Sequence, residues 1–581
     1  KVIRYAVKTS ENMGDWRNIV CLVADDEDNN LHYNQAEQLA QMLDTVNKNL
    51  NIEKIYLDAY QQKSTASGAR YPEVTRDLTT RNERGALIVN YTGHGGEGGL
   101  AHERILKTTD INEWRNPDNM PVFITATCEF SRFDDPGRVS AGELVFLNEH
   151  GGGIALFTTT RATYASPNFE LNKSVYKYAF LKTNGEYMRL GDVIRMAKNE
   201  NGNDSNERKF SLLGDPALKF AIPENNVITA EINNVSIAES TDTIKALSKV
   251  TISGEIQNSK GEKLTDFNGM LFPTVYDKPA QYRTLGNDEG STPSTFRIQK
   301  NPLYKGKASI EKGNWSFTFI APKDIAYNYG FGKISYYAHN NETDGAGHFN
   351  DIMVGGFNHL AEPDNAGPNA RLFINDTNFV FGGLTDENPT LVALIYDLNG
   401  INTIGNGIGH DILATLDGSE SYILNNYYEA ELDSYQKGTI TYPLYDLSEG
   451  LHRLDLRVWD IYNNSTTAYT EFIVAESEEM VLNSLMNYPN PFSNNTTFTF
   501  EHNQLDESLD IQIRIFSMDG RLVKTLEDIY FAGGYKYKSE QWNGTDEKNS
   551  LLNGGIYVYK LIMRNSDGSV VEETSKLVIR R

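Results

Sequence analysis

Two short segments of this chain place a reactive side chain in a loop at the end of an apolar run. Residues 90–96 carry His94 between glycines, and residues 125–129 carry Cys128. A thiol is a weak nucleophile until it is deprotonated, and a nearby histidine can hold it as a thiolate and then protonate a leaving amine. We therefore expect Cys128 to attack a peptide carbonyl and His94 to transfer the proton.

Each of these segments also has a simpler explanation. A lone cysteine at a strand end is usually structural, and a Gly-His-Gly-Gly loop is often only a flexible turn. Their occurrence on successive apolar strands favours chemistry, because ligands of parallel sheets bind in the crevice at the carboxyl ends of the strands. The glycines leave room for an extended substrate, so we expect the N–H groups of Gly95 and Cys128 to face the developing oxyanion.

A carboxylate that orients His94 is also expected, and three aspartates remain open alternatives: Asp25, Asp26 and Asp135. Asp25, Asp26 and Asp28 form an acidic cluster whose hard oxygens suit calcium. The cluster lacks the loop spacing of a known calcium site. We therefore expect a solvated turn, no metal site and no required cofactor.

The other cysteine and the other histidines of this region have less reactive surroundings. Cys21 lies in the apolar run 19–23, which is typical of a buried strand in which cysteine packs as a small hydrophobe. His32, His102 and His150 lack a comparable setting. We expect these three histidines to be solvated.

A third loop directly follows a core strand and consists of Arg161, Ala162, Thr163 and Tyr164. A loop at that strand end borders the same crevice as the two reactive segments. We expect it to make substrate-specificity contacts, although an ordinary strand-to-helix turn is nearly as good an explanation.

The elements that must position these residues alternate between apolar strands and amphipathic helices from residue 1 to about 222. This alternation is typical of a largely parallel sheet covered on both faces. The predicted strands are 17–24, 54–60, 85–92, 121–127 and 153–159. The predicted helices are 33–49, 71–82, 140–150, 168–180 and 190–200. Both reactive segments then fall at the ends of neighbouring strands.

After residue 222 the helical pattern fades, and short alternating segments separated by Gly, Asn and Asp turns follow. We expect a β-sandwich over 223–361 and an immunoglobulin-like β-sandwich over 362–475. A C-terminal β-sandwich is expected over 476–581, opening on the acidic linker 476–479. The predicted fold class is therefore multidomain, an α/β domain over 1–222 followed by all-β modules.

Composition excludes several classes of protein. The net charge of -24, from 78 acidic and 54 basic residues, argues against nucleic-acid binding, which needs a basic face. Two cysteines rule out a scaffold stapled by many disulfides. The chain has no run of eighteen apolar residues and begins without an initiator Met or a signal peptide, so we expect a mature or excised fragment.

Residues 91–96, 125–130 and 212–216 together resemble the gingipain family of cysteine peptidases. The resemblance implies a caspase-like fold, with the His-Gly loop and the Cys at the ends of adjacent parallel strands. Residues 23–28 match the acidic strand end near the family's site. Family members carry a further half-domain and often a long N-terminal region before this segment, which again implies a fragment.

Within that family, residues 128–136 and 397–402 are similar to the signal peptidase and sortase of type IX secretion. Residues 488–557 resemble the C-terminal sorting domain of proteins exported by that system. These resemblances imply an enzyme at the bacterial cell surface that cleaves the sorting domain from arriving cargo and holds the cargo as a thioester on Cys128.

The same resemblances imply three partners. They are cargo proteins bearing sorting domains, anionic lipopolysaccharide as the amine acceptor, and an outer-membrane protein anchor of the type IX attachment complex. Two alternatives stay open. One is a secreted degradative gingipain-like protease whose terminal module is its own export tag, and the other is a non-catalytic surface scaffold.

Overall fold

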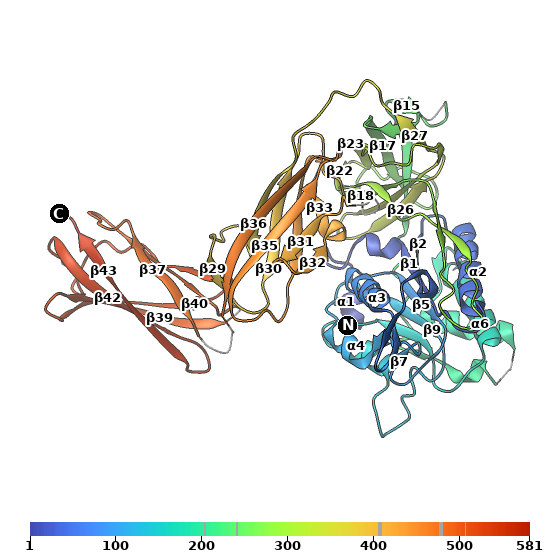
Figure 1. Cartoon of the computed structure of the whole chain (residues 1–581), viewed down its shortest axis with the longest axis horizontal. Helices are drawn as coiled ribbons and strands as arrows, with labels where there is room; N and C mark the ends of the chain where they lie inside the picture. Colours follow the sequence, from blue (N-terminus) through green and yellow to red (C-terminus); the bar gives the residue numbers. More distant parts are fainter. Residues whose placement is uncertain (203–204, 240–241, 405–408, 476–479, 506) are drawn as a thin grey trace. The chain divides into compact units, whose positions relative to one another are not determined.

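The computed structural model describes residues 1–202, 205–239, 242–404, 409–475, 480–505 and 507–581 (Figure 1). It divides into two compact units, the first of residues 1–362 with 432–434 and the second of residues 363–431 with 435–581. The predicted acidic linker 476–479 lies outside the described residues. The other predicted module boundaries stay predictions.

A mostly parallel sheet organises the N-terminal part of the first unit. Its strands are, in spatial order, β13 (Phe210–Leu213), β10 (Ala155–Thr159), β9 (Val122–Ala126), β5 (Ile88–Thr92), β1 (Ile19–Ala24) and β2 (Asn51–Tyr56). All neighbours pair in parallel except β13, which pairs antiparallel with β10. β5, β9 and β10 are buried at every position, as expected for a sheet covered on both faces.

Helices cover both faces of this sheet (Figure 1). On one face lie α2 (Leu31–Val46), α6 (Ala165–Ala179) and α7 (Leu190–Asn201), and on the other lie α3 (Pro72–Arg84), α4 (Thr108–Glu113) and α5 (Ala141–Leu147). Alternate side chains of β1 enter the two cores: Val20 and Leu22 pack on the first face, and Cys21 and Val23 on the second. Cys21 is fully buried, so its predicted core role is confirmed.

Local sequence signals explain several element ends. Pro72 occupies the first turn of α3, where its missing N–H costs nothing. Ser140 begins α5 through a capping box, in which the Glu143 carboxylate accepts the Ser140 N–H at 2.8 Å. Every predicted strand and helix of this region has a counterpart, whereas β13, α4, α1 (Val2–Ala6) and several short strands were not predicted. The predicted fold class, an α/β domain followed by all-β modules, is confirmed.

The all-β module that follows differs from the predicted sandwich, because its main sheet closes on itself. The sheet runs in the order β14 (Asn225–Ile232), β17 (Lys249–Gln257), β23 (Asn314–Ile320), β22 (Ala308–Glu311), β18 (Gly269–Tyr276), β25 (Lys333–His339) and β26 (Asp344–Phe349). β26 also pairs with β14, which joins the two ends. Strands of a closed sheet and strands of a sandwich both alternate between buried and exposed residues, as β17 does. The sequence pattern therefore could not distinguish these two architectures.

The second unit contains two β-sandwiches. The first faces β28 (Asn369–Ile374), β30 (Thr390–Tyr396), β34 (Lys437–Pro443) and β33 (Tyr428–Ala430) against β29 (Gly383–Thr385), β36 (Ser465–Val474), β35 (Gly450–Trp459), β31 (Leu413–Leu416) and β32 (Glu420–Ile423). The second faces β37 (Leu482–Tyr488), β38 (Thr497–His502) and β41 (Lys536–Lys538) against β40 (Leu522–Phe531), β39 (Ser508–Ser517), β42 (Gly555–Arg564) and β43 (Val570–Ile579). Within the described ranges, every helix is too short or too polar to cross a membrane.

Candidate active site

The carboxyl ends of β1, β5, β9 and β10 meet at one edge of the sheet and carry the predicted reactive residues. Thr92 and Ala126 are the last paired residues of β5 and β9, and the Gly93 N–H donates to the Ala126 carbonyl at 3.4 Å. His94 and Cys128 therefore occupy equivalent positions, each two residues past the end of its strand. The topology brings the two predicted catalytic residues to adjacent strand ends.

Cys128 is half-buried, and its sulfur contacts the loop that follows β10. The Thr163 N–H donates to Cys128 Sγ at 3.4 Å, and Sγ lies 3.6 Å from the Thr163 carbonyl oxygen. Across the described chain, Sγ makes no hydrogen bond to the His94 ring, and the Cys128 N–H has no acceptor. Catalytic hydrogen bonds of substrate-free enzymes are often long and tighten when substrate binds.

The backbone of His94 is held by two buried side chains. The His94 N–H donates to Asp25 Oδ2 at 2.7 Å, and the Tyr91 hydroxyl donates to the His94 carbonyl at 2.6 Å. Residue 93 must be glycine, because a Cβ at this position would lie 2.3 Å from Asp25 Cβ. The position of the His94 loop is therefore set by β1 and β5 together.

The His94 ring contacts carboxylates that sequence reasoning did not choose. Its Nε2 lies 3.1 Å from Asp28 Oδ2 and 3.4 Å from Glu27 Oε2, and the side chain is 35% exposed. Both carboxylates belong to the acidic loop, which we define as residues 25–30. The acidic run after β1 was the available signal, but it did not show which members point at the ring.

Within the described residues, none of the three aspartates proposed from sequence hydrogen bonds to the His94 ring. Asp25 accepts the backbone N–H of His94 rather than a ring proton. Asp26 accepts a short hydrogen bond from the Tyr71 hydroxyl, and Asp135 accepts the Gly137 N–H of its own turn at 2.9 Å. Burial raises the pKa of Asp25 and of Asp26, which favours the neutral form of both buried carboxyls.

Two further histidines flank the His94 ring. His102 stacks on it with ring centroids 5.1 Å apart, its Nδ1 lies 2.7 Å from Glu27 Oε1, and its side chain is 70% exposed. His32 meets it edge-on at 5.4 Å. The expectation that His32 is solvated is wrong, because the first turn of α2 buries it to 3% exposure against the ring.

The predicted oxyanion segment packs tightly against the residue that precedes Cys128. A Cβ on Gly95 would lie 2.7 Å from the Thr127 hydroxyl oxygen, so the Gly95 backbone is in close approach to the Thr127 side chain. The Thr159 hydroxyl donates to the Thr127 carbonyl at 2.6 Å, and the Thr163 hydroxyl donates to it at 3.0 Å. Side chains from β10 and its loop thereby hold the peptide that leads into Cys128.

The loop predicted to contact substrate lies beside Cys128, and its four residues differ in the groups they expose. Thr163 contacts the sulfur, as described. Arg161 is engaged in a two-pronged ion pair with Asp134, at 2.8 and 2.5 Å. The Ala162 carbonyl accepts the Lys209 ammonium at 2.7 Å, whereas the Tyr164 side chain is 73% exposed.

A loop of the following β module braces the acidic loop, which sequence reasoning missed. It connects β19 (Ala280–Arg283) to β20 (Thr295–Ile298). The Ser291 hydroxyl donates to the Asp26 carbonyl at 2.6 Å, and the Thr292 N–H donates to the Asn30 side chain at 2.7 Å. The module therefore supports the loop whose residues contact His94, although more than 260 residues separate these partners in sequence.

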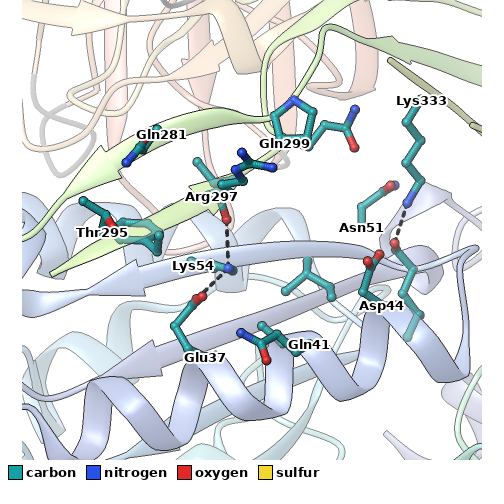
Figure 2. Close-up of a pocket in the computed structure, with 16 residues that line it drawn as sticks. Glu37, Gln41, Asp44, Asn51, Lys54, Gln281, Thr295, Arg297, Gln299 and Lys333 are labelled. Atoms are coloured by element: carbon teal, nitrogen blue, oxygen red, sulfur yellow. Dashed lines mark hydrogen bonds and ion pairs between the residues drawn. The ribbon is translucent and has the colours of Figure 1, made fainter. Parts of the chain in front are cut away.

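The same β19–β20 hairpin borders a separate cavity of ≈570 Å³ beside α2 and β2 (Figure 2). Lys54 contacts Glu37 Oε1 at 2.5 Å and the Arg297 carbonyl at 2.8 Å, as Figure 2 shows. The Lys333 ammonium donates to the Leu50 carbonyl at 2.6 Å. Neither Cys128 nor His94 lines this cavity, so it is distinct from the candidate active site.

Residues 1–221 match the model of peptidase family C25. This part of the chain is a C25 domain. The family match covers β1 to β13 and therefore both reactive strand ends. The resemblance to gingipain-type cysteine peptidases is confirmed, and with it the assignment of this region as a cysteine peptidase domain.

Two solved structures are among those to which the chain is similar. Dimeric latent PorU from Porphyromonas gingivalis is 20% identical, with a TM-score of 0.31, over 97% of this chain. The Arg-specific cysteine proteinase gingipain R is 16% identical, with a TM-score of 0.32, over 61% of this chain and 71% of its own. The chain spans 64% of the length of the PorU chain. No curated protein sequence matches it.

Proposed function

We propose that Cys128 is the nucleophile of the C25 domain and that His94 is its general acid and base. The observation that carries this proposal is their placement at equivalent positions of the adjacent, parallel strand ends of β5 and β9. Sγ attacks the peptide carbonyl carbon, and His94 accepts the thiol proton and delivers it to the leaving amine. The product is a thioester on Cys128, which water or an amine then attacks.

The N–H of Cys128, which has no acceptor within the described chain, is one donor to the oxyanion, and the N–H of Gly95 is the second. Removal of one such donor costs about 100- to 1000-fold in kcat in other enzymes. Glu27 and Asp28 orient the His94 ring and stabilise its imidazolium form. They take the role first considered for Asp25, Asp26 and Asp135.

For specificity, we assign the substrate contacts to the loop after β10. Tyr164 offers an exposed aromatic face, and the backbone of Ala162 and Thr163 lies beside the nucleophile. Arg161 can contact an acidic substrate group only by exchanging its partner Asp134. The pairing makes Arg161 the weakest candidate of the four.

At the level of biology, we propose that the chain removes the C-terminal sorting domain of type IX secretion cargo and transfers the cargo to anionic lipopolysaccharide. It would act at the bacterial cell surface, held there by an outer-membrane protein anchor of the attachment complex. The similarity of residues 128–136 and 397–402 to the sortase of that system supports this proposal, as does the terminal β-sandwich.

The alternative is a secreted degradative protease that carries the terminal sandwich as its own export tag. To separate the two, the purified chain is mixed with a protein ending in a sorting domain, with and without anionic lipopolysaccharide, and the products are analysed by mass spectrometry. A cargo mass increased by sugar supports transfer. Rapid hydrolysis of generic peptides after Arg or Lys, without transfer, supports the degradative protease.

Cys128→Ala is the matched control, because the chain keeps Cys21 as an unreactive second thiol. Unchanged cargo processing by this variant would contradict catalysis by Cys128, whereas absence of processing by both wild type and variant would support the non-catalytic scaffold.

A further inference from the structure

Metal-binding side chains surround the His94 ring. In one trio, Asp28, His32 and His94 each offer a ligand atom within 4.8 Å of the other two. In a second trio, Glu27, His94 and His102 do the same. Imidazole nitrogens combined with carboxylate oxygens are the ligands that Zn²⁺ takes in sites with three protein ligands and one open position.

Two of the three ligand-atom distances in the first trio match a tetrahedral site. Asp28 Oδ2 lies 3.1 Å from His94 Nε2 and 3.3 Å from His32 Nε2. Zn²⁺ bonds of about 2.0–2.1 Å in tetrahedral geometry place neighbouring ligand atoms about 3.3 Å apart. Small side-chain rotations would therefore bring all three atoms onto one ion.

His32 is the second observation that points to a ligand. It is 3% exposed, its Nδ1 has no hydrogen-bond partner, and the contact of its Nε2 is with the Asp28 carboxylate of the same trio at 3.3 Å, without hydrogen-bond geometry. Leaving a buried polar group unpaired costs free energy, and a metal ion would satisfy it. His102 differs, because it is 70% exposed and already hydrogen bonded to Glu27 at 2.7 Å. The first trio is therefore the better metal site.

We propose that Asp28, His32 and His94 bind a divalent transition-metal ion of the zinc class, which reversibly inhibits the peptidase. The inhibitory part rests on the proposed function, whereas the binding part does not. A metal ion on Nε2 leaves the neutral ring with its one proton on Nδ1. That ring has no lone pair left to accept the proton of Cys128, so no thiolate forms through His94.

Binding is tested with Zn²⁺ and a competing chromophoric chelator, on the full chain in a Cys128→Ala background that removes the nearby thiol. We expect one Zn²⁺ per chain. His32→Gln should weaken binding by at least about tenfold, the size of effect seen even for groups that only support a ligand. His102→Gln, the matched control, should change it less than twofold. Wild-type Zn²⁺ affinity in His32→Gln would overturn the site. So would a loss of affinity in His102→Gln as large as that in His32→Gln.

Since His32 is buried, its variant is also checked by thermal unfolding without metal. Asp28→Asn, at a side chain that is 49% exposed, provides a second variant that should weaken Zn²⁺ binding with little effect on folding. Retention of wild-type affinity by this variant would likewise overturn the site.

Inhibition is tested on the chain with Cys128 intact. Zn²⁺ should abolish peptide cleavage by wild type and His102→Gln, EDTA should restore it, and His32→Gln should resist it. A wild-type chain that binds Zn²⁺ but cleaves no substrate in EDTA would overturn the proposed function and leave the metal site standing. An active chain that Zn²⁺ neither binds nor inhibits would overturn the metal site alone.

Discussion

Replacing Gly95 by alanine tests the close approach between the two reactive strand ends. The new Cβ would lie 2.7 Å from the Thr127 hydroxyl oxygen and 3.1 Å from the Gly99 carbonyl oxygen. The first distance forces movement of either the Gly95 backbone or Thr127, which precedes the nucleophile. Gly96→Ala is the matched control, since a Cβ there has nothing within 4 Å.

The expected magnitude follows from which group moves. Overpacking of this kind costs about 1–3 kcal/mol of stability. If the Gly95 N–H leaves the oxyanion, kcat falls by about 100- to 1000-fold. Thr127→Ala removes the clashing hydroxyl, so the double variant Gly95→Ala/Thr127→Ala should recover most of the lost kcat, a coupling that a double-mutant cycle measures.

The assay is steady-state cleavage of whichever peptide from a mixed library the wild type cuts, with thermal unfolding measured in parallel. A folded Gly95→Ala chain with wild-type kcat would refute the assignment of Gly95 to the oxyanion segment. So would a Gly96→Ala chain that loses as much activity.

Further predictions concern titration, bracing and thiol reactivity. Burial raises the pKa of Glu103 to about 7, so its proton stabilises the fold below pH 4.5 and this contribution is lost as pH rises to about 7. Glu103→Gln should therefore raise the melting temperature at pH 8 in EDTA and barely change it at pH 5. Equal changes in melting temperature at the two pH values would contradict a buried charge on Glu103 at pH 8. Ser291→Ala removes the 2.6 Å bond to the Asp26 carbonyl, so it should cost about 1 kcal/mol of unfolding free energy and several-fold in kcat. An unchanged kcat would show that the Ser291 hydrogen bond does not affect the active site. Iodoacetamide should alkylate half-buried Cys128 and spare fully buried Cys21, because burial raises the pKa of the Cys21 thiol. Peptide mapping would locate the label, and modification of Cys21 before Cys128 would contradict this prediction.

The placement of His94 and Cys128 at adjacent strand ends was predictable because its signals are local. An apolar run that ends in a Gly-rich His loop, and another that ends in Cys128, identify neighbouring strand ends once the α/β alternation is recognised. The fold of residues 1–222 was predictable for the same reason. β2 is the least accurate of the predicted strands, because residues 57–59 leave the sheet as a short 3-10 turn.

The carboxylates at the His94 ring were not predictable, because backbone conformation decides which acidic side chains point at it. Asp28, Asn29 and Asn30 have φ values of 61°, 56° and 66° in succession. Asp and Asn tolerate this left-handed region, and the run turns the acidic loop back toward His94. An Asp-Asn-Asn sequence permits such a turn without requiring it, so Asp25 and Asp26 looked equally suitable.

The support of the acidic loop by the β19–β20 loop and the burial of His32 were not predictable for a different reason. Both depend on contacts between segments distant in sequence, such as Ser291 with Asp26 and His32 with His94. No periodicity or composition reports such contacts. They appear only when the β module and the C25 domain are seen as parts of one compact unit.

The central claim, that Cys128 forms a thioester with the substrate, is tested most directly by trapping the acyl-enzyme. The chain is mixed with a substrate that it cleaves, quenched in acid within the first turnover, and digested for mass spectrometry. The account predicts an acyl adduct on the peptide that contains Cys128, none on the peptide that contains Cys21, and no cleavage by Cys128→Ala. Continued cleavage by Cys128→Ala would contradict it.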